Sequence, residues 1–162
     1  MKHLYLVRHA KSSWEYDVSD HKRPLNKRGF KDAHLVSNHL RDIITLPDLV
    51  ISSDANRALT TANIFISNLG LNNDDIKLDH ELYDFGGGGL TNVIKTCDDS
   101  IKTLMVFGHN HAMTYFVNTF GDKPIGNVPT SGFAHIELDI QSWNELNKGT
   151  TILTVFPKDL KT

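Results

Sequence analysis

The chain has 162 residues, enough for one domain with a sizeable hydrophobic core but too few for two full domains. Its 17 lysines and arginines against 19 acidic residues give no basic excess, which argues against a nucleic-acid-binding protein. Cys97, the single cysteine, can form no internal disulfide, and no apolar run suits a signal peptide or a membrane span. We expect one domain over residues 1–162 in the cytoplasm, a monomer or weak oligomer without nucleic-acid or membrane partners.

The first two expected elements are a strand and a helix. Leu4-Tyr5-Leu6-Val7 is a short apolar run of the kind found inside a sheet. Residues 25–43 show the spacing of an amphipathic helix, with Asn26 as its N-cap. The apolar face of this helix should be formed by Phe30, Ala33, Val36, Leu40 and Ile43.

A second strand and helix follow. Residues 48–53 form a short β-branched run that turns polar, and residues 54–70 form a second amphipathic helix. Gly70 is placed to end this helix, because glycine favours the C-terminal cap position. Residues 76–90 form a less regular segment.

The second half of the chain begins with a third buried run and a third helix. The apolar run lies at 103–109 and the helical pattern at 112–121. Residues 132–140 alternate as a half-exposed strand does, and with 151–156 they suggest a hairpin or sheet edge. Buried strands that alternate with amphipathic helices predict an α/β fold, a three-layer α/β/α sandwich around a mainly parallel sheet.

Polar side chains gather where three of these strands end. The first strand ends in Arg8-His9, the second leads to Arg57 in the first turn of its helix, and the third ends in Gly108-His109. Because ligands of open α/β sheets bind beyond the carboxyl ends of the strands, these side chains should share one crevice. Two arginine forks repel each other unless an anion lies between them, and phosphate matches their bidentate geometry. The sequence therefore predicts a phosphate pocket.

This residue set suits phosphoryl transfer without a metal. Such chemistry needs cations on the equatorial oxygens and a nucleophile in line with the leaving group. His9 can attack through one ring nitrogen when a backbone acceptor holds the other.

Four spaced motifs carry a family resemblance over roughly residues 2–156. They read "LVRHAKSSW", "RPLNKRG", "ISSDANRALTTA" and "VFGHN", in this order. With these four motifs the chain resembles the histidine phosphatase superfamily, which has the phosphoglycerate-mutase-like fold. The short length and the form "RHAKSSW" with "RPL..RG" are most similar to the small SixA-type branch, the phosphohistidine phosphatases.

The resemblance implies a role for each candidate residue. His9 is the nucleophile that becomes phosphorylated, and Arg8, Arg57 and His109 line the phosphate pocket and stabilise the transferring group. Water then hydrolyses phospho-His9, and neither a metal nor a cofactor is required. Glu81 lies where the family's general acid commonly falls, although an exposed glutamate at a strand end fits the same position.

The resemblance favours protein-borne phosphohistidine as the substrate. A small phosphomonoester, such as a sugar or nucleotide phosphate, stays open as an alternative. A leaving imidazole departs more easily than an alkoxide, so Glu81 discriminates poorly between these substrates. A short chain has little length for a lid, which favours an open site and a protein substrate.

Several features depart from the family pattern or suggest other chemistry. Ala10 replaces a frequent glycine, and His111 stands where proline often follows, with its side chain expected in solvent. The tetraglycine Gly86–Gly89 lacks the Lys-Ser/Thr ending of a P-loop, so we interpret it as a mobile loop beside the site. Cys97 has threonine rather than arginine six positions later, unlike a cysteine phosphatase, and should be a half-buried structural residue.

Two function classes outside this chemistry stay open. In one alternative, His109 and His111 chelate zinc with Glu81 or Asp84, which would make the protein a metal-dependent hydrolase. A non-catalytic phosphate-binding module would use the same arginines without turnover.

Overall fold

The structure, a computed structural model, describes residues 1–161 and contains a six-stranded sheet. The strands are β1 (Lys2–Arg8), β2 (Leu49–Ser52), β3 (Ile76–Leu78), β4 (Thr103–Gly108), β5 (Phe133–Leu138) and β6 (Thr150–Val155). Their order is β3-β2-β4-β1-β5-β6. Strands β3, β2, β4 and β1 pair in parallel, whereas β5 is antiparallel to both β1 and β6. The predicted mainly parallel sheet and the C-terminal hairpin at its edge are therefore confirmed.

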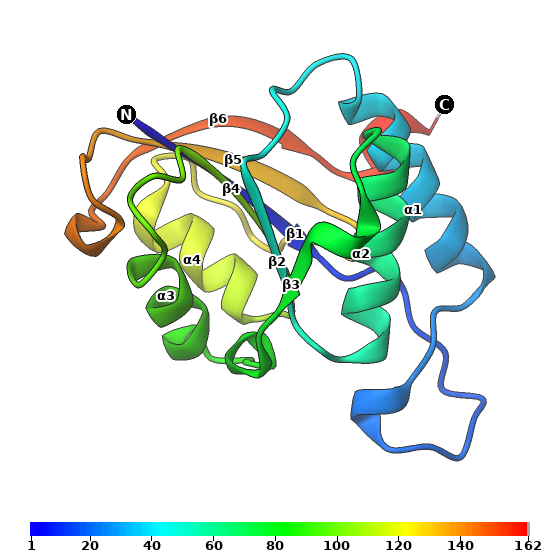
Figure 1. The fold of residues 1–162 in the computed structure, drawn as a ribbon. Coiled ribbons are helices and arrows are strands. Elements are labelled where there is room, and N and C mark those ends of the chain that lie inside the picture. The colour runs from blue at the N-terminus through cyan, green and yellow to red at the C-terminus, as the bar shows by residue number, and fades with distance from the viewer. Residues whose placement is uncertain (162) are drawn as a thin grey trace.

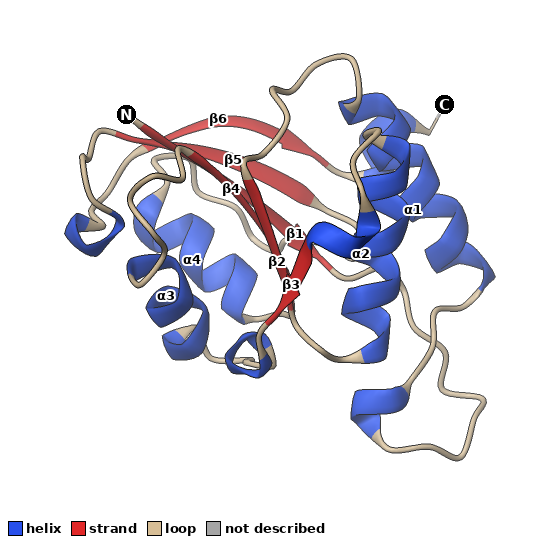
Figure 2. Ribbon diagram, viewed as in Figure 1, coloured by secondary structure: helices blue, strands red, loops and turns tan. Residues whose placement is uncertain are grey.

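Helices cover both faces of the sheet (Figures 1 and 2). One face carries α1 (Lys27–Leu40), α2 (Asn56–Asn68) and the short α5 (Pro157–Leu160), and the other carries α3 (Gly88–Lys95) and α4 (Ala112–Phe120). The predicted three-layer α/β/α sandwich is confirmed. Four short 3-10 helices lie in the connections: η1 (Asp20–Lys22), η2 (Asn73–Asp75), η3 (His80–Leu82) and η4 (Trp143–Glu145).

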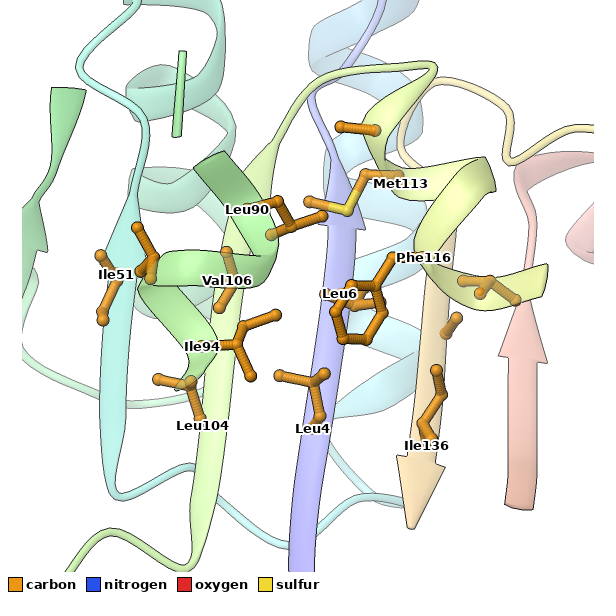
Figure 3. Packing of buried hydrophobic residues seen from close by; sticks show 14 of the residues in the cluster. Leu4, Leu6, Ile51, Leu90, Ile94, Leu104, Val106, Met113, Phe116 and Ile136 are labelled. Carbon is orange, nitrogen blue, oxygen red and sulfur yellow. The ribbon is translucent and has the colours of Figure 1, made fainter. Parts of the chain in front are cut away.

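Alternate side chains of β1 pack into two separate cores. Leu4 and Leu6 belong to the cluster under α3 and α4, where Phe116 packs close to Leu6 (Figure 3). Tyr5 and Val7 belong to the cluster under α1 and α2. Each fully buried side chain of this size contributes roughly 1.5–3 kcal/mol to stability. The four-residue apolar run is thus buried on both sides, which fixes the position of the polar residues that follow it.

Helix α1 is shorter than the sequence pattern suggested. The Asn26 side chain caps it by accepting a hydrogen bond from Gly29 N at 2.8 Å, as predicted. The helix ends at Leu40, so the assignment of Ile43 to its buried face was wrong, and Phe30 is also exposed. At the end of α2, Gly70 takes a positive φ of 80° and confirms the predicted terminator.

The second half of the tetraglycine segment starts a helix, and Gly86 and Gly87 lie in the turn before it. Gly88 and Gly89 form the first turn of α3, and Gly87 precedes them with a φ of 114°. Asp84 organises this turn, because its carboxylate accepts hydrogen bonds from Gly86 N, Gly87 N and Leu90 N at 2.9–3.1 Å. A Cβ at Gly87 would lie 2.4 Å from the Tyr115 ring, so glycine is required there. The predicted loop is therefore corrected to a capped helix N-terminus.

The strand β3 was missed because it is only three residues long and largely exposed. Cys97 is half-buried, as predicted, and burial raises the pKa of its thiol to about 11. No helix within residues 1–161 is long and apolar enough to cross a membrane.

Two glycines offer a matched test of packing. A Cβ at Gly29 would lie 2.1 Å from the backbone oxygen of Lys11, whereas a Cβ at Gly88 would meet no atom within 4 Å. Gly29→Ala should lower the free energy of unfolding by about 1–3 kcal/mol. Gly88→Ala should leave it unchanged or raise it by up to about 1 kcal/mol, because alanine favours the helix. Denaturant titration measures both values, and equal effects of the two changes would contradict this packing.

Candidate active site

The sheet register places three chain segments side by side at one edge. Arg8 lies opposite Gly108 in the β1–β4 pairing. The ladder continues past the strand ends, since His9 N donates to Gly108 O at 3.0 Å and Ser53 N donates to Phe107 O at 2.9 Å. These backbone bonds align the residues that follow β1, β2 and β4 without any contribution from their side chains.

Arg8, His9, Arg57 and His109 all line one open pocket of about 430 Å³ at this edge. Arg57 is the second residue of α2, and its Nε lies 3.4 Å from Nε2 of His9. The imidazole rings of His9 and His109 have centroids 5.2 Å apart. The structure therefore brings together the four side chains expected to share a crevice.

His9 is held in one orientation by its own backbone. Its Nδ1 lies 2.7 Å from Ala10 O, so Nδ1 carries the ring proton and donates it to this carbonyl. Burial, helped by the charges of Arg57 and Arg8, lowers the pKa of His9 to about 3 against the opposing effect of this hydrogen bond. At neutral pH the ring is uncharged, and the lone pair of Nε2 faces the pocket, where it accepts a long hydrogen bond from Arg57 Nε at 3.4 Å.

His109 is the most deeply buried of the four side chains, with 1% of its surface exposed. Its Nε2 lies 2.9 Å from Ser53 Oγ, which also accepts a hydrogen bond from Ala55 N at 3.2 Å. This arrangement favours donation from the Ser53 hydroxyl to Nε2 and leaves the ring proton on Nδ1. Burial, helped by the nearby His9 and Arg57, lowers the pKa of His109 to about 3. Its Nδ1 is buried without a hydrogen-bond partner among the described residues.

Arg8 also has a buried donor without a hydrogen-bond partner among the described residues. One terminal nitrogen donates to Val128 O at 2.9 Å, but its Nε is buried and has no partner among residues 1–161. Burial and the charge of Arg57 lower the pKa of Arg8. Buried donors without acceptors are costly, so Arg8 Nε and His109 Nδ1 together indicate a site for an acceptor with several oxygens.

Asp20 compensates the second guanidinium and was missed by sequence reasoning. Its carboxylate accepts from Arg57 at 2.9 Å, from Arg23 at 2.9 Å and from the Tyr83 hydroxyl at 2.5 Å. Burial acts to raise the pKa of Asp20, but the hydrogen bonds from Tyr83, Arg23 and Arg57 outweigh it and hold the pKa far below its ordinary value. Asp20 therefore stays anionic and holds Arg57 in place.

Arg23 and Trp14 complete one wall of the pocket. The guanidinium carbon of Arg23 lies 3.2 Å from the centroid of the Trp14 ring, and Arg23 also donates to Ser12 Oγ. The side chain of Trp14 is 78% exposed although it lines the pocket. Arg23 belongs to the quoted motif "RPLNKRG". That motif is the sequence feature from which Arg23 could have been identified as a residue of the pocket.

Comparison with protein families agrees with this geometry. The model of the histidine phosphatase superfamily (branch 1) matches residues 4–97, a segment that includes Arg8, His9 and Arg57. The chain belongs to the histidine phosphatase superfamily. The membership inferred from the four motifs is thereby confirmed.

Relatives of this histidine phosphatase cover nearly its whole length. It is 33% identical over 160 residues to an uncharacterized protein of Mycobacterium tuberculosis (strain H37Rv), covering 93% of this chain and 98% of that protein. A structure from Agrobacterium tumefaciens, assigned as the phosphohistidine phosphatase SixA, matches with a TM-score of 0.80 and 25% identity over 96% of this chain and 99% of that one. The protein histidine phosphatase SixA in complex with tungstate shares the fold, with a TM-score of 0.79 and 23% identity over 98% and 99% of the two chains.

Glu81 lies outside the pocket of this histidine phosphatase. Its carboxylate accepts two hydrogen bonds from Asn92 Nδ2, at 2.8 and 3.1 Å, and it is exposed. Glu81 is not among the residues that line the pocket. The structure thus leaves the expected general acid apart from the other four residues.

The zinc arrangement considered for His109 and His111 is not assembled. His109 is buried against Ser53, while His111 is exposed at the start of α4. Glu81 and Asp84 are engaged by Asn92 and by the α3 turn. Among residues 1–161, the group of three side chains spaced for a metal ion is a different one, His21, Asp54 and His80.

The buried imidazoles make stability depend on pH. In the folded protein His9 and His109 stay neutral down to about pH 3, whereas an unfolded histidine takes up a proton below about pH 6.5. The unfolded state binds more protons as the pH falls below about 6.5. Each imidazole should therefore lower the free energy of unfolding by about 1.4 kcal/mol for every unit by which the pH falls.

Urea unfolding in phosphate-free buffer between about pH 6.5 and pH 5 measures this slope. His9→Gln and His109→Gln should each make the slope shallower. A slope that neither change affects would contradict the neutral, buried state of these rings.

Proposed function

We propose that this histidine phosphatase removes the phosphoryl group from protein-borne phosphohistidine through a phospho-His9 intermediate. The observation that carries the proposal is the state of His9. Its Nδ1 is fixed on Ala10 O, its Nε2 is unprotonated, and Arg8, Arg57 and His109 surround it. A nucleophile with an unprotonated ring nitrogen among several cationic or polar donors is what phosphoryl transfer requires.

In the first step, Nε2 of His9 forms a bond to phosphorus while the bond from phosphorus to the substrate's imidazole nitrogen breaks. When the substrate's phosphoimidazole ring is protonated, its imidazole departs as a neutral group, so this step needs no separate acid. The Nε of Arg8 and the Nδ1 of His109 are the buried donors available to the equatorial oxygens. Each such charge-assisted hydrogen bond contributes roughly 1.5–3 kcal/mol.

In the second step, water attacks the phosphorus of phospho-His9. The phosphorus–nitrogen bond breaks, the electron pair returns to Nε2, and inorganic phosphate leaves. The Nδ1 bond to Ala10 O keeps the ring in place through both steps. Every role in this cycle is filled by a side chain of the pocket, so the proposed mechanism uses no metal and no cofactor.

Two features support a protein as the phosphate carrier. Trp14 and Phe85 line the pocket and are 78% and 46% exposed, so two aromatic side chains at the pocket are accessible from solvent. Exposed aromatic groups of this kind are characteristic of contacts with another protein. The names of the SixA structures agree, since one is a protein histidine phosphatase and binds tungstate, a tetrahedral oxyanion.

The intermediate can be trapped directly. Incubation with a protein that carries ³²P-phosphohistidine, followed by an alkaline quench, should leave label on His9, located by peptide mapping. His9→Ala should take no label and lose turnover, whereas His39→Ala, at an exposed histidine of α1, should label as the wild type does. Undiminished turnover by His9→Ala would exclude the intermediate. Wild-type activity should persist after treatment with a chelator.

The choice of substrate has a separate test. N-phosphoimidazole shares the reacting bond of phosphohistidine but lacks the protein, and a nucleotide monophosphate represents small esters. Trp14→Ala should lower kcat/KM for the phosphohistidine protein at least about tenfold more than for N-phosphoimidazole.

Phe30→Ala is the matched control, because Phe30 is an exposed aromatic residue of α1 outside the pocket. It should leave both values unchanged. Equal losses on both substrates after Trp14→Ala, or a preference of the wild type for the nucleotide, would favour the small-molecule phosphatase instead.

A further inference from the structure

Three side chains beside the pocket form a cluster that the phosphatase mechanism does not use. His21 lies in η1, Asp54 in the connection between β2 and α2, and His80 at the start of η3. His21 Nε2 lies 2.8 Å from one oxygen of Asp54, and His80 Nδ1 lies 2.9 Å from the other. One ligand atom from each residue lies within 4.8 Å of the other two. We propose that His21, Asp54 and His80 form a binding site for Zn²⁺ or a similar divalent transition metal.

The donor set selects the class of metal. Two imidazole nitrogens and one carboxylate oxygen suit zinc and its neighbours, whereas magnesium and calcium prefer oxygen ligands alone. Zinc sites with two histidines and one carboxylate complete their coordination with water. The site is therefore an open one, with at least one position for water or another small ligand.

The spacing is close to what an ion needs. Two atoms bound about 2.1 Å from a tetrahedral zinc lie about 3.4 Å apart, so the present nitrogen–oxygen distances of 2.8–3.0 Å require only small side-chain movements. Ion binding would replace the hydrogens that the two imidazoles now donate to Asp54.

The cluster is reachable from solvent. The side chains of His21, Asp54 and His80 are 35%, 30% and 72% exposed. The Tyr83 ring packs edge-on against His21 with centroids 5.0 Å apart, and it lies 5.7 Å from His80. An ion can enter from the outer side while Tyr83 limits the movement of both rings.

Binding would tie three separate segments together next to the active site. His21 directly follows Asp20, the residue that holds Arg57 and accepts from Tyr83. An ion on His21 would attach η1 to the β2–α2 connection and to η3. The ion would thus restrain the short helix that positions Asp20, and the fold should gain stability in proportion to site occupancy.

Isothermal titration of the full chain with Zn²⁺, after removal of metals by a chelator, tests the site. The wild type should bind one ion, with a rise in thermal midpoint and, for Co²⁺, visible absorption of a low-symmetry site. His21→Ala, His80→Ala and Asp54→Asn should each weaken binding at least about tenfold. His39→Ala, at an exposed histidine of α1, should bind as the wild type does.

A further arm uses His9→Ala, which removes the proposed nucleophile. Zinc binding retained by this variant supports the separate site, and it does so whether or not the protein dephosphorylates phosphohistidine. Loss of binding in His9→Ala with full binding in His21→Ala and His80→Ala would place the ion in the phosphate pocket and overturn the proposal. Absence of saturable binding by the wild type would overturn it as well and reduce the cluster to a hydrogen-bond network. Circular dichroism checks each fold, and His80→Gln replaces His80→Ala should the latter fail to fold.

Discussion

Two guanidinium groups converge on one neutral imidazole at the carboxyl edge of the sheet, and the rest of the site is arranged around their mutual repulsion. Arg57 is compensated by Asp20, while Arg8 donates only to a carbonyl and keeps a buried Nε without a partner among the described residues. Burial and the neighbouring charge already lower the pKa of Arg8. A bound oxyanion would relieve this repulsion and accept a hydrogen bond from the remaining donor, so both effects add to the affinity of the site for phosphate.

The same cations preserve His9 as the proposed nucleophile. A protonated His9 would have no lone pair on Nε2, and burial together with Arg57 and Arg8 keeps its pKa at about 3. The low pKa of His109 has the same origin in burial and neighbouring charge. An anion in the pocket favours the protonated form of nearby imidazoles, so donation from His109 strengthens as negative charge gathers on the transferring group. Substrate binding and nucleophile activation therefore depend on one distribution of charge.

The convergence of Arg8, His9, Arg57 and His109 was predictable because each follows a buried strand that is legible in the sequence. Parallel strands end at one edge, and the β1–β4 register turns that general rule into neighbouring side chains. The position of Arg57 follows from its place in the first turn of α2. Local pattern and topology thus sufficed for the cationic part of the pocket.

Asp20 gave no such signal. It lies in a three-residue 3-10 helix without apolar spacing, and its bond to Arg57 spans 37 positions of the chain. Helix α3 was missed for a related reason, since its start is fixed by the Asp84 carboxylate and by the close approach of Tyr115 to Gly87, while four glycines indicate a loop. The pairing of Glu81 with Asn92 is equally a tertiary contact. Each of these residues takes its role from a partner that only the folded chain supplies.

The shape of the pocket bears on the fate of a phosphorylated His9. An enzyme that returns a phosphoryl group to a second substrate must exclude water from the intermediate. Here the side chain of Asp20 is 43% exposed and Trp14 is 78% exposed, so this side of the pocket lies open to solvent. Water can therefore reach phospho-His9 as soon as the leaving group departs. In the proposed mechanism, such a pocket favours hydrolysis of phospho-His9 over transfer to a second substrate.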